Sequence, residues 1–321
     1  MHKDNSNFTF GCYAKVLFIV AIAFLVYGLI LDYNNEHKLI DPVLHNRNRD
    51  IKVTNVDVHD DKSKSKLDSN ESDISNAENR MEFYETIYAN DEKNENLRSE
   101  IENTYGIEVK YGQETFGYAV GGMDTEPITD SFAITTSLEN LSRVLKLYPS
   151  GFFKEINDGG IPLTIYLIDE FSINGVTGVT DSNNNFANIV IAIEYSFDET
   201  FFHESYHYIE RFMLKSGLNF KSWNSFNPAN FSYNKDQSNA IHEYSYNRNF
   251  KEDAYFVNDY AQTDASEDRA STFEYMMDTS KASCLNNGRN IWKKAKFISD
   301  SIESAFKSVS PSVTEYWERH L

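Results

Sequence analysis

Cysteine is nearly absent from this 321-residue chain, which contains only Cys12 and Cys284. The two thiols lie on either side of an apolar segment near the N-terminus, so they cannot form a disulfide if that segment crosses a membrane. There is also no C-x-x-C pair, which excludes a zinc ribbon. The sequence therefore has no disulfide framework, which is unusual for eukaryotic secretion but acceptable at a bacterial cell surface.

Basic residues are also in short supply, with 30 Lys and Arg against 49 Asp and Glu and a formal net charge of −19. Nucleic-acid binding needs a basic surface that displaces counterions, so this class of function is excluded. An anionic membrane surface would repel the chain, so any membrane attachment must be hydrophobic. The acidity favours solubility over the alternative, a preference for basic substrates.

One long hydrophobic run stands out near the N-terminus. Residues 16–31 carry no charge, and residues 14–33 together have about the length that crosses a bilayer core. No A-x-A cleavage pattern follows the run, which favours an uncleaved anchor over a signal peptide. Because Lys3 and Lys15 precede the span, we expect the N-terminus in the cytoplasm and everything after residue 33 outside the cell.

The chain is expected to divide into three parts. Residues 1–33 form the N-terminal transmembrane anchor. Residues 34–80 are rich in charges, Ser and Asn, and cannot bury enough apolar surface to fold, so we expect a disordered polar tether. Residues 81–321 form the folded domain, whose aromatic content of 14 % is consistent with a sizeable core.

Hydrophobic spacing predicts the first elements of the domain. Apolar residues recur at helical intervals over 82–104 and 138–156, and short apolar or alternating runs predict strands over 105–112, 163–169 and 186–193.

The second half of the domain is expected to be mainly helical. Ser196 and Glu199 have the spacing of a capping box, which predicts a helix over 197–214. The polar and aromatic stretch 216–260 is typical of an irregular insertion. The last two predicted helices cover 265–279 and 288–309.

Residues 203–207 read His-Glu-Ser-Tyr-His, an H-E-x-x-H motif inside the first of these helices. Residues four apart lie on one helix face, so His203 and His207 can bind a single ion. Glu204 can then accept a proton from water that zinc has made acidic. Histidine is scarce, with 8 in the chain, and a chance motif has odds of roughly one in a hundred, which disfavours two solvated surface histidines.

A catalytic zinc ion needs a third protein ligand and an open position. The longer motif H-E-x-x-H-x-x-G-x-x-H is absent, so neither His242 nor His320 is favoured. The best candidate is the carboxylate of Glu267, three residues after the helix-capping Asp264; alternatively, Glu267 merely closes a capping box. If Glu267 is not the ligand, the next candidates are Glu252, Asp253 and Glu274.

The pattern H-E-x-x-H followed by Y-x6-E-x-x-A resembles the gluzincin-type peptidases of the anthrax lethal factor and Pro-Pro endopeptidase kind over roughly residues 160–280. The stretches FFHESYHYIE, WNSFNP and SEDRASTFEYM are also similar to bacterial zinc metallopeptidases of this broad type. The resemblance implies that Glu267 is the third zinc ligand and that Tyr260 supports the oxyanion. Ser271 stands where related helices often carry a second glutamate, and the long spacer after His207 excludes the thermolysin arrangement.

Several other residues allow two interpretations. Aromatic side chains after the motif could line a substrate cleft, although burial statistics favour the core. They are Trp223, Phe226, Phe231 and Tyr233. Asp268 and Arg269 could orient a histidine ligand or form a solvated pair.

These features predict an α+β, zincin-like fold with a small mixed sheet, an active-site helix, a mostly helical C-terminal lobe and an N-terminal transmembrane helix. The resemblance implies that substrate pairs along a sheet edge, for which we expect strand 186–193. The expected function is that of a membrane-anchored extracellular peptidase that uses Zn²⁺ to hydrolyse peptides or proteins. A non-catalytic cell-surface binding module on the same fold is the alternative, and the presence of both Glu204 and Glu267 disfavours it.

Overall fold

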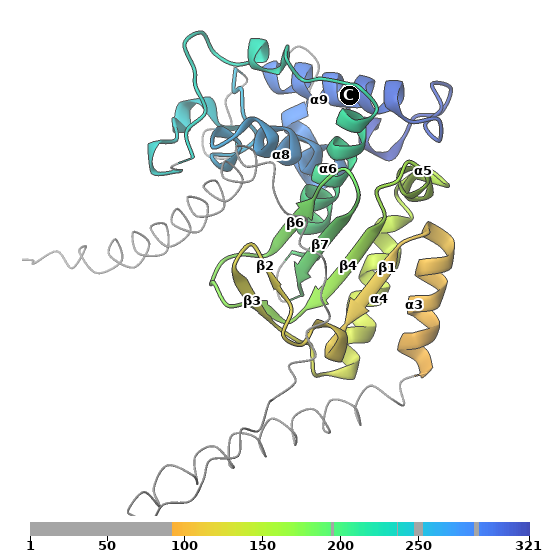
Figure 1. The fold of residues 1–321 in the computed structure, drawn as a ribbon. Helices are drawn as coiled ribbons and strands as arrows, with labels where there is room; N and C mark the ends of the chain where they lie inside the picture. The colour runs from red at the N-terminus through yellow and green to blue at the C-terminus, as the bar shows by residue number, and fades with distance from the viewer. Residues whose placement is uncertain (1–91, 194–195, 236, 247–252, 286–288) are drawn as a thin grey trace, which may run out of the picture.

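The computed structural model describes residues 92–193, 196–235, 237–246, 253–285 and 289–321 (Figure 1). The predicted transmembrane anchor, the predicted tether and residues 82–91 of the first predicted helix lie outside the described residues, as does Cys12. Among the described residues, no helix combines the length and the apolar character that a membrane span requires.

A four-stranded mixed sheet forms the centre of the N-terminal half (Figure 1). Its strand order is β1 (Glu108–Tyr111), β4 (Leu163–Ile168), β7 (Ala187–Ala192) and β6 (Gly178–Ser182). The first three strands run parallel, and β6 runs antiparallel to β7. The three strands predicted from the sequence are therefore confirmed, and β6 is a further strand that the sequence did not predict.

The sheet edge beside the active-site helix is β6, so the prediction that strand 186–193 forms this edge is wrong. β7 is hydrogen-bonded to β4 on one side and to β6 on the other. Its side chains are almost all fully buried, which is typical of an internal strand of a mainly parallel sheet. In contrast, all five residues of β6 are half-buried, as expected at an edge.

Alternate residues of the central strands face two hydrophobic clusters. Leu163, Ile165 and Leu167 pack in the main core with the helices. Tyr166 and Ile168 face the other side, where a small antiparallel sheet covers them. The helices of the N-terminal half that contribute to the main core are α3 (Glu92–Tyr105), α4 (Ser131–Leu145) and α5 (Phe152–Asp158). The small sheet consists of β2 (Ala119–Val120), β3 (Met123–Glu126) and β5 (Glu170–Phe171).

The single helix predicted over 138–156 is two helices, because the chain turns between α4 and α5. Pro149 disfavours helical geometry in the residue before it. Gly151 then adopts a left-handed conformation, with φ of 80°, immediately before α5. The apolar residues that suggested one helix are buried as expected, because residues from both helices lie in the same core.

The C-terminal half is mainly helical, as predicted. In the part of the chain that the structure describes, its long helices are α6 (Phe197–Lys215), α8 (Ala265–Met277) and α9 (Asn290–Ala305). α8 packs against both α6 and α9. α6 begins where the sequence predicted, but the Ser196 side chain makes no capping hydrogen bond, so the predicted capping box is wrong. The Asp264 side chain does cap α8, by accepting a hydrogen bond from the Ser266 backbone N–H. The described part of 216–260 contains short 3-10 segments and much irregular structure.

Candidate metal centre

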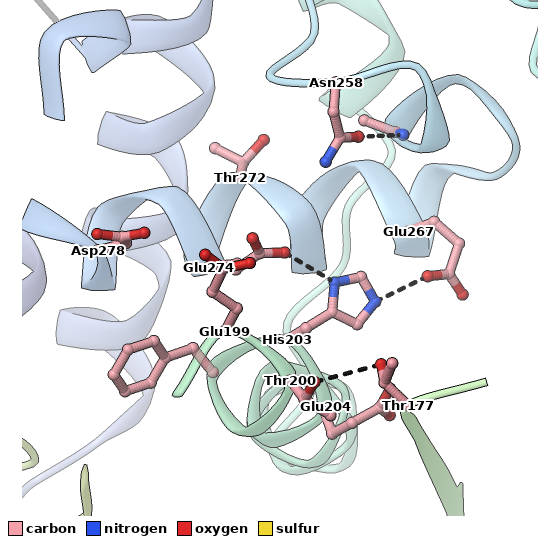
Figure 2. Close-up of polar contacts among 12 residues, drawn as sticks. Thr177, Glu199, Thr200, His203, Glu204, Asn258, Glu267, Thr272, Glu274 and Asp278 are labelled. Carbon is pink, nitrogen blue, oxygen red and sulfur yellow. Dashed lines mark hydrogen bonds and ion pairs between the residues drawn. The ribbon is translucent and has the colours of Figure 1, made fainter. Parts of the chain in front are cut away.

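The packing of α8 against α6 brings Glu267 to the two histidines of the H-E-x-x-H motif. Figure 2 shows the contact between Glu267 and His203. The imidazole rings of His203 and His207 are 5.1 Å apart between centroids. Glu267 Oε2 lies 3.0 Å from His203 Nε2 and 3.5 Å from His207 Nε2. The fold thus brings these three side chains together across the 59 residues that separate His207 from Glu267.

The donor set suits a zinc ion. One ligand atom from each of the three residues lies within 4.8 Å of the other two, and no second such group of His, Cys, Asp or Glu occurs among the described residues. Two imidazole nitrogens and one carboxylate oxygen are a ligand set that catalytic zinc sites use. His242 instead contacts Asp259, with 2.8 Å between Nδ1 and Oδ2.

The electrostatics of the site favour bound positive charge. Burial raises the pKa of Glu267, but His207 and His203 outweigh this effect and hold the pKa well below its ordinary value. Burial lowers the pKa of His203, but contacts with Glu267 and Glu274 outweigh it and raise the pKa well above its ordinary value. Carboxylates that stabilise a proton on an imidazole also stabilise a cation that replaces it, so this pattern is consistent with a metal site.

A carboxylate supports the other ring nitrogen of His203 (Figure 2). Glu274 Oε2 lies 3.6 Å from His203 Nδ1, so Glu274 faces the side of the ring away from Glu267. The Nζ of Lys281 donates to the other oxygen of Glu274 at 2.8 Å. Glu274 is thus a supporting residue for His203, whereas the sequence suggested it only as a substitute ligand. Its position two helical turns after Glu267 is the signal that could have identified it.

A polar chain also supports His207. Ser266 Oγ lies 3.3 Å from His207 Nδ1 and donates to Glu210 Oε2 at 2.8 Å. Arg269 Nε donates to Glu210 Oε1 at 2.7 Å. Because the hydroxyl proton of Ser266 goes to Glu210, the hydroxyl oxygen can accept from Nδ1–H. That tautomer leaves Nε2 of His207 free to bind a metal.

The predicted solvated pair of Asp268 and Arg269 is wrong, because both side chains are buried and each has another partner. Asp268 Oδ2 accepts hydrogen bonds from Lys294 Nζ at 2.6 Å, Tyr233 Oη at 2.7 Å and Trp223 Nε1 at 3.0 Å. Arg269 supports His207 indirectly, through the chain described above. Trp223 belongs to the core, and Phe226, Phe231 and Tyr233 pack against it, as burial statistics favoured.

Glu204 and Tyr260 lie beside the three candidate ligands. Glu204 is buried at the start of the motif, where the hydroxyl of Thr180 on β6 lies 2.8 Å from its Oε2. Tyr260 lies in a 3-10 segment (Tyr260–Gln262) just before α8, with its ring centroid 5.8 Å from that of His203. Burial, followed by the charges of Glu267 and Glu204, raises the pKa of Tyr260 well above its ordinary value, so its hydroxyl stays protonated and can donate.

Comparisons with known proteins add a distant structural likeness to this geometry. No protein-family model matches the chain, and no curated protein matches it. Among solved structures, the chain is similar to a "putative zinc-binding metallo-peptidase" from Bacteroides caccae, with 16 % sequence identity and a TM-score of 0.47. The likeness covers 71 % of this chain and 89 % of that one. At this level of similarity, the functional assignment depends on the geometry of the site alone.

Proposed function

We propose that this chain is a zinc-dependent peptidase with a zincin-like, gluzincin-type active site. His203, His207 and Glu267 would hold the ion. The observation that carries the proposal is the convergence of these three donors, from α6 and α8, beside the buried carboxylate of Glu204. When bound, zinc supplies Lewis-acid chemistry that polarises the scissile carbonyl and makes water more acidic.

Glu204 and Tyr260 have the positions that the remaining chemistry requires. The Glu204 carboxylate accepts a proton from the attacking water and then passes it to the leaving amine, which is general acid–base catalysis by one residue. The protonated hydroxyl of Tyr260 donates a hydrogen bond to the oxygen that becomes negative when water attacks the carbonyl. Neither residue belongs to the proposed ligand set, so each can be changed without removing a ligand.

The free edge of β6 suits an extended peptide. Thr177 O accepts from Ala192 N, and Asn183 N donates to Phe186 O, so the backbone groups of odd-numbered residues face β7. By alternation, the backbone N–H and C=O groups of Gly178, Thr180 and Ser182 face the free edge. A substrate that adds as a further strand would pair with these groups.

Metal analysis together with cleavage of a mixed peptide library tests the proposal. The purified full-length chain in detergent should hold one zinc ion and cleave peptides. A chelator should abolish cleavage, and added zinc should restore it. A chain with stoichiometric zinc that binds peptides without cleaving them would favour the alternative, a cell-surface binding module. A chain that binds no zinc would refute the proposal.

We also propose that the domain is anchored in the membrane and lies outside the cell, because of the apolar run 16–31 and the lysines before it, Lys3 and Lys15. Protease added to intact cells should therefore digest residues after 33. A domain that is protected until the cells are lysed would contradict this topology, and a soluble form cut near residue 33 would indicate a signal peptide instead.

A further inference from the structure

The edge strand β6 makes an unusually close approach to α6 beside Glu204. A Cβ atom added to Gly178 would lie 2.8 Å from Glu204 Cγ and 2.5 Å from Thr200 Cγ2. Real Cβ atoms essentially never come this near to another heavy atom, so position 178 requires glycine. The same approach places Glu204 Oε1 close to β6, since it would lie 3.2 Å from that Cβ.

This close approach lets a short hydroxyl side chain reach the proposed catalytic base. Thr180 Oγ1 lies 2.8 Å from Glu204 Oε2 and 2.9 Å from the Glu204 backbone oxygen. Its hydroxyl therefore holds one carboxylate oxygen, and Oε1 takes no part in that hydrogen bond. A carboxylate anchored through one oxygen can present the other to water in a fixed orientation.

Thr180 also connects the base to the proposed peptide-binding edge. Its backbone N–H and C=O face the free edge of β6, whereas its side chain contacts Glu204 on α6. A peptide that pairs with the backbone of Thr180 would thus restrain the residue whose hydroxyl orients Glu204. A second hydroxyl contact lies nearby, between α6 and the residue directly before β6, with 3.2 Å between Thr200 Oγ1 and Thr177 Oγ1 (Figure 2). It does not involve Glu204.

We propose that Thr180 is a positioning residue, which orients Glu204 for proton transfer from the strand along which substrate would bind. This inference rests on the proposed peptidase function. It goes beyond that function by assigning to the edge strand a role in placing the base as well as in binding substrate.

The test compares Thr180→Val, which removes the hydroxyl and keeps the shape, with Thr180→Ser, which keeps the hydroxyl. Thr177→Val is the matched control, because it removes a hydroxyl that contacts α6 from the residue directly before β6 and does not touch Glu204. Thr180→Val removes a hydrogen bond to a charged group, and this loss should lower kcat roughly 10- to 100-fold. KM should change little, because the backbone groups of β6 that pair with substrate are unchanged. Zinc content and the thermal unfolding midpoint should also change little, because Glu204 is not a ligand and Val keeps the shape of Thr. Thr180→Ser should retain kcat within about threefold, well inside the tenfold that 1.4 kcal/mol represents, and Thr177→Val should behave like the wild type.

The outcomes separate this inference from the proposed function. An active wild type together with an unchanged kcat in Thr180→Val would refute the positioning role alone. An equal loss in the Val and Ser variants, accompanied by a lower unfolding midpoint, would also refute it, because packing and not the hydroxyl would then be responsible. A wild-type chain that holds zinc but cleaves no peptide would refute the proposed function and this inference with it.

Discussion

Replacement of Glu267 by alanine tests most directly whether α8 completes a metal site. Glu267 Oε2 lies within 3.5 Å of the Nε2 atoms of both His203 and His207, so its loss removes one of three converging donors. Structural zinc sites with four ligands bind with about 10–16 kcal/mol, or roughly 2.5–4 kcal/mol for each ligand. Since 1.4 kcal/mol is tenfold, Glu267→Ala should weaken zinc binding about 10²- to 10³-fold.

Competition with a chromophoric chelator at fixed pH measures this change. Glu274→Gln provides a graded comparison, because Glu274 supports His203 from the far side of the ring without belonging to the ligand set. Loss of such a supporting group typically costs about 10- to 100-fold in metal affinity, so the two variants should rank in that order. Asp300→Asn removes one negative charge from the exposed face of α9 and should leave the zinc affinity unchanged.

Full zinc affinity in Glu267→Ala would show that Glu267 is not a ligand. A stronger effect from Glu274→Gln than from Glu267→Ala would indicate that the roles of the two carboxylates are exchanged. Among the other candidate carboxylates, Asp253 is exposed and does not belong to the cluster, and Glu252 lies outside the described residues. Glu274 is therefore the substitute ligand that the described residues offer.

Three further substitutions test other parts of the site. Glu204→Gln should retain zinc and lose at least about 10²–10⁴ in peptide cleavage rate, because the amide cannot accept the proton; wild-type cleavage rates would exclude the base role. Tyr260→Phe should lower kcat about 10²- to 10³-fold with little change in KM, and unaltered steady-state turnover would refute the oxyanion role. Lys294→Met should lower the free energy of unfolding, measured by urea denaturation, by about 3–5 kcal/mol, because it leaves the Asp268 carboxylate buried without its cation. Adding Asp268→Leu should recover most of that loss, and a Lys294→Met chain of unchanged stability would show that the pair carries no such energy.

The sequence predicted the elements in which the pattern of apolar residues indicates which faces are buried. Strands β4 and β7 are continuous apolar runs because both of their faces are buried. α6 has an apolar face of regular period, and the H-E-x-x-H spacing locates the site on it. The position of Glu267 could be predicted because a helix begins directly after Asp264, whose side chain caps it.

The features that the sequence did not predict depend on contacts between distant segments. β6 escaped prediction because its five residues are uniformly half-buried, so it has neither an apolar run nor an alternating pattern. The roles of Thr180 and Gly178 follow from the distance between β6 and α6, which no local pattern encodes. The turn between α4 and α5 did have a local signal, in Pro149 and Gly151, but the regular apolar spacing across it favoured one helix.

The rotation of α8 about its own axis depends more on polar contacts than on a stripe of apolar residues. Successive residues of a helix are about 100° apart, and consecutive residues of α8 make polar contacts with different neighbours. Ser266 contacts Glu210 on α6, Glu267 contacts both motif histidines, and Asp268 contacts the buried Lys294 on α9. Rotating α8 by a single residue would take Glu267 away from His203 and leave the Lys294 ammonium without its carboxylate. Since an unpaired buried charge costs several kcal/mol, the ion pair with α9 disfavours that rotation and thereby keeps the candidate metal ligand facing α6.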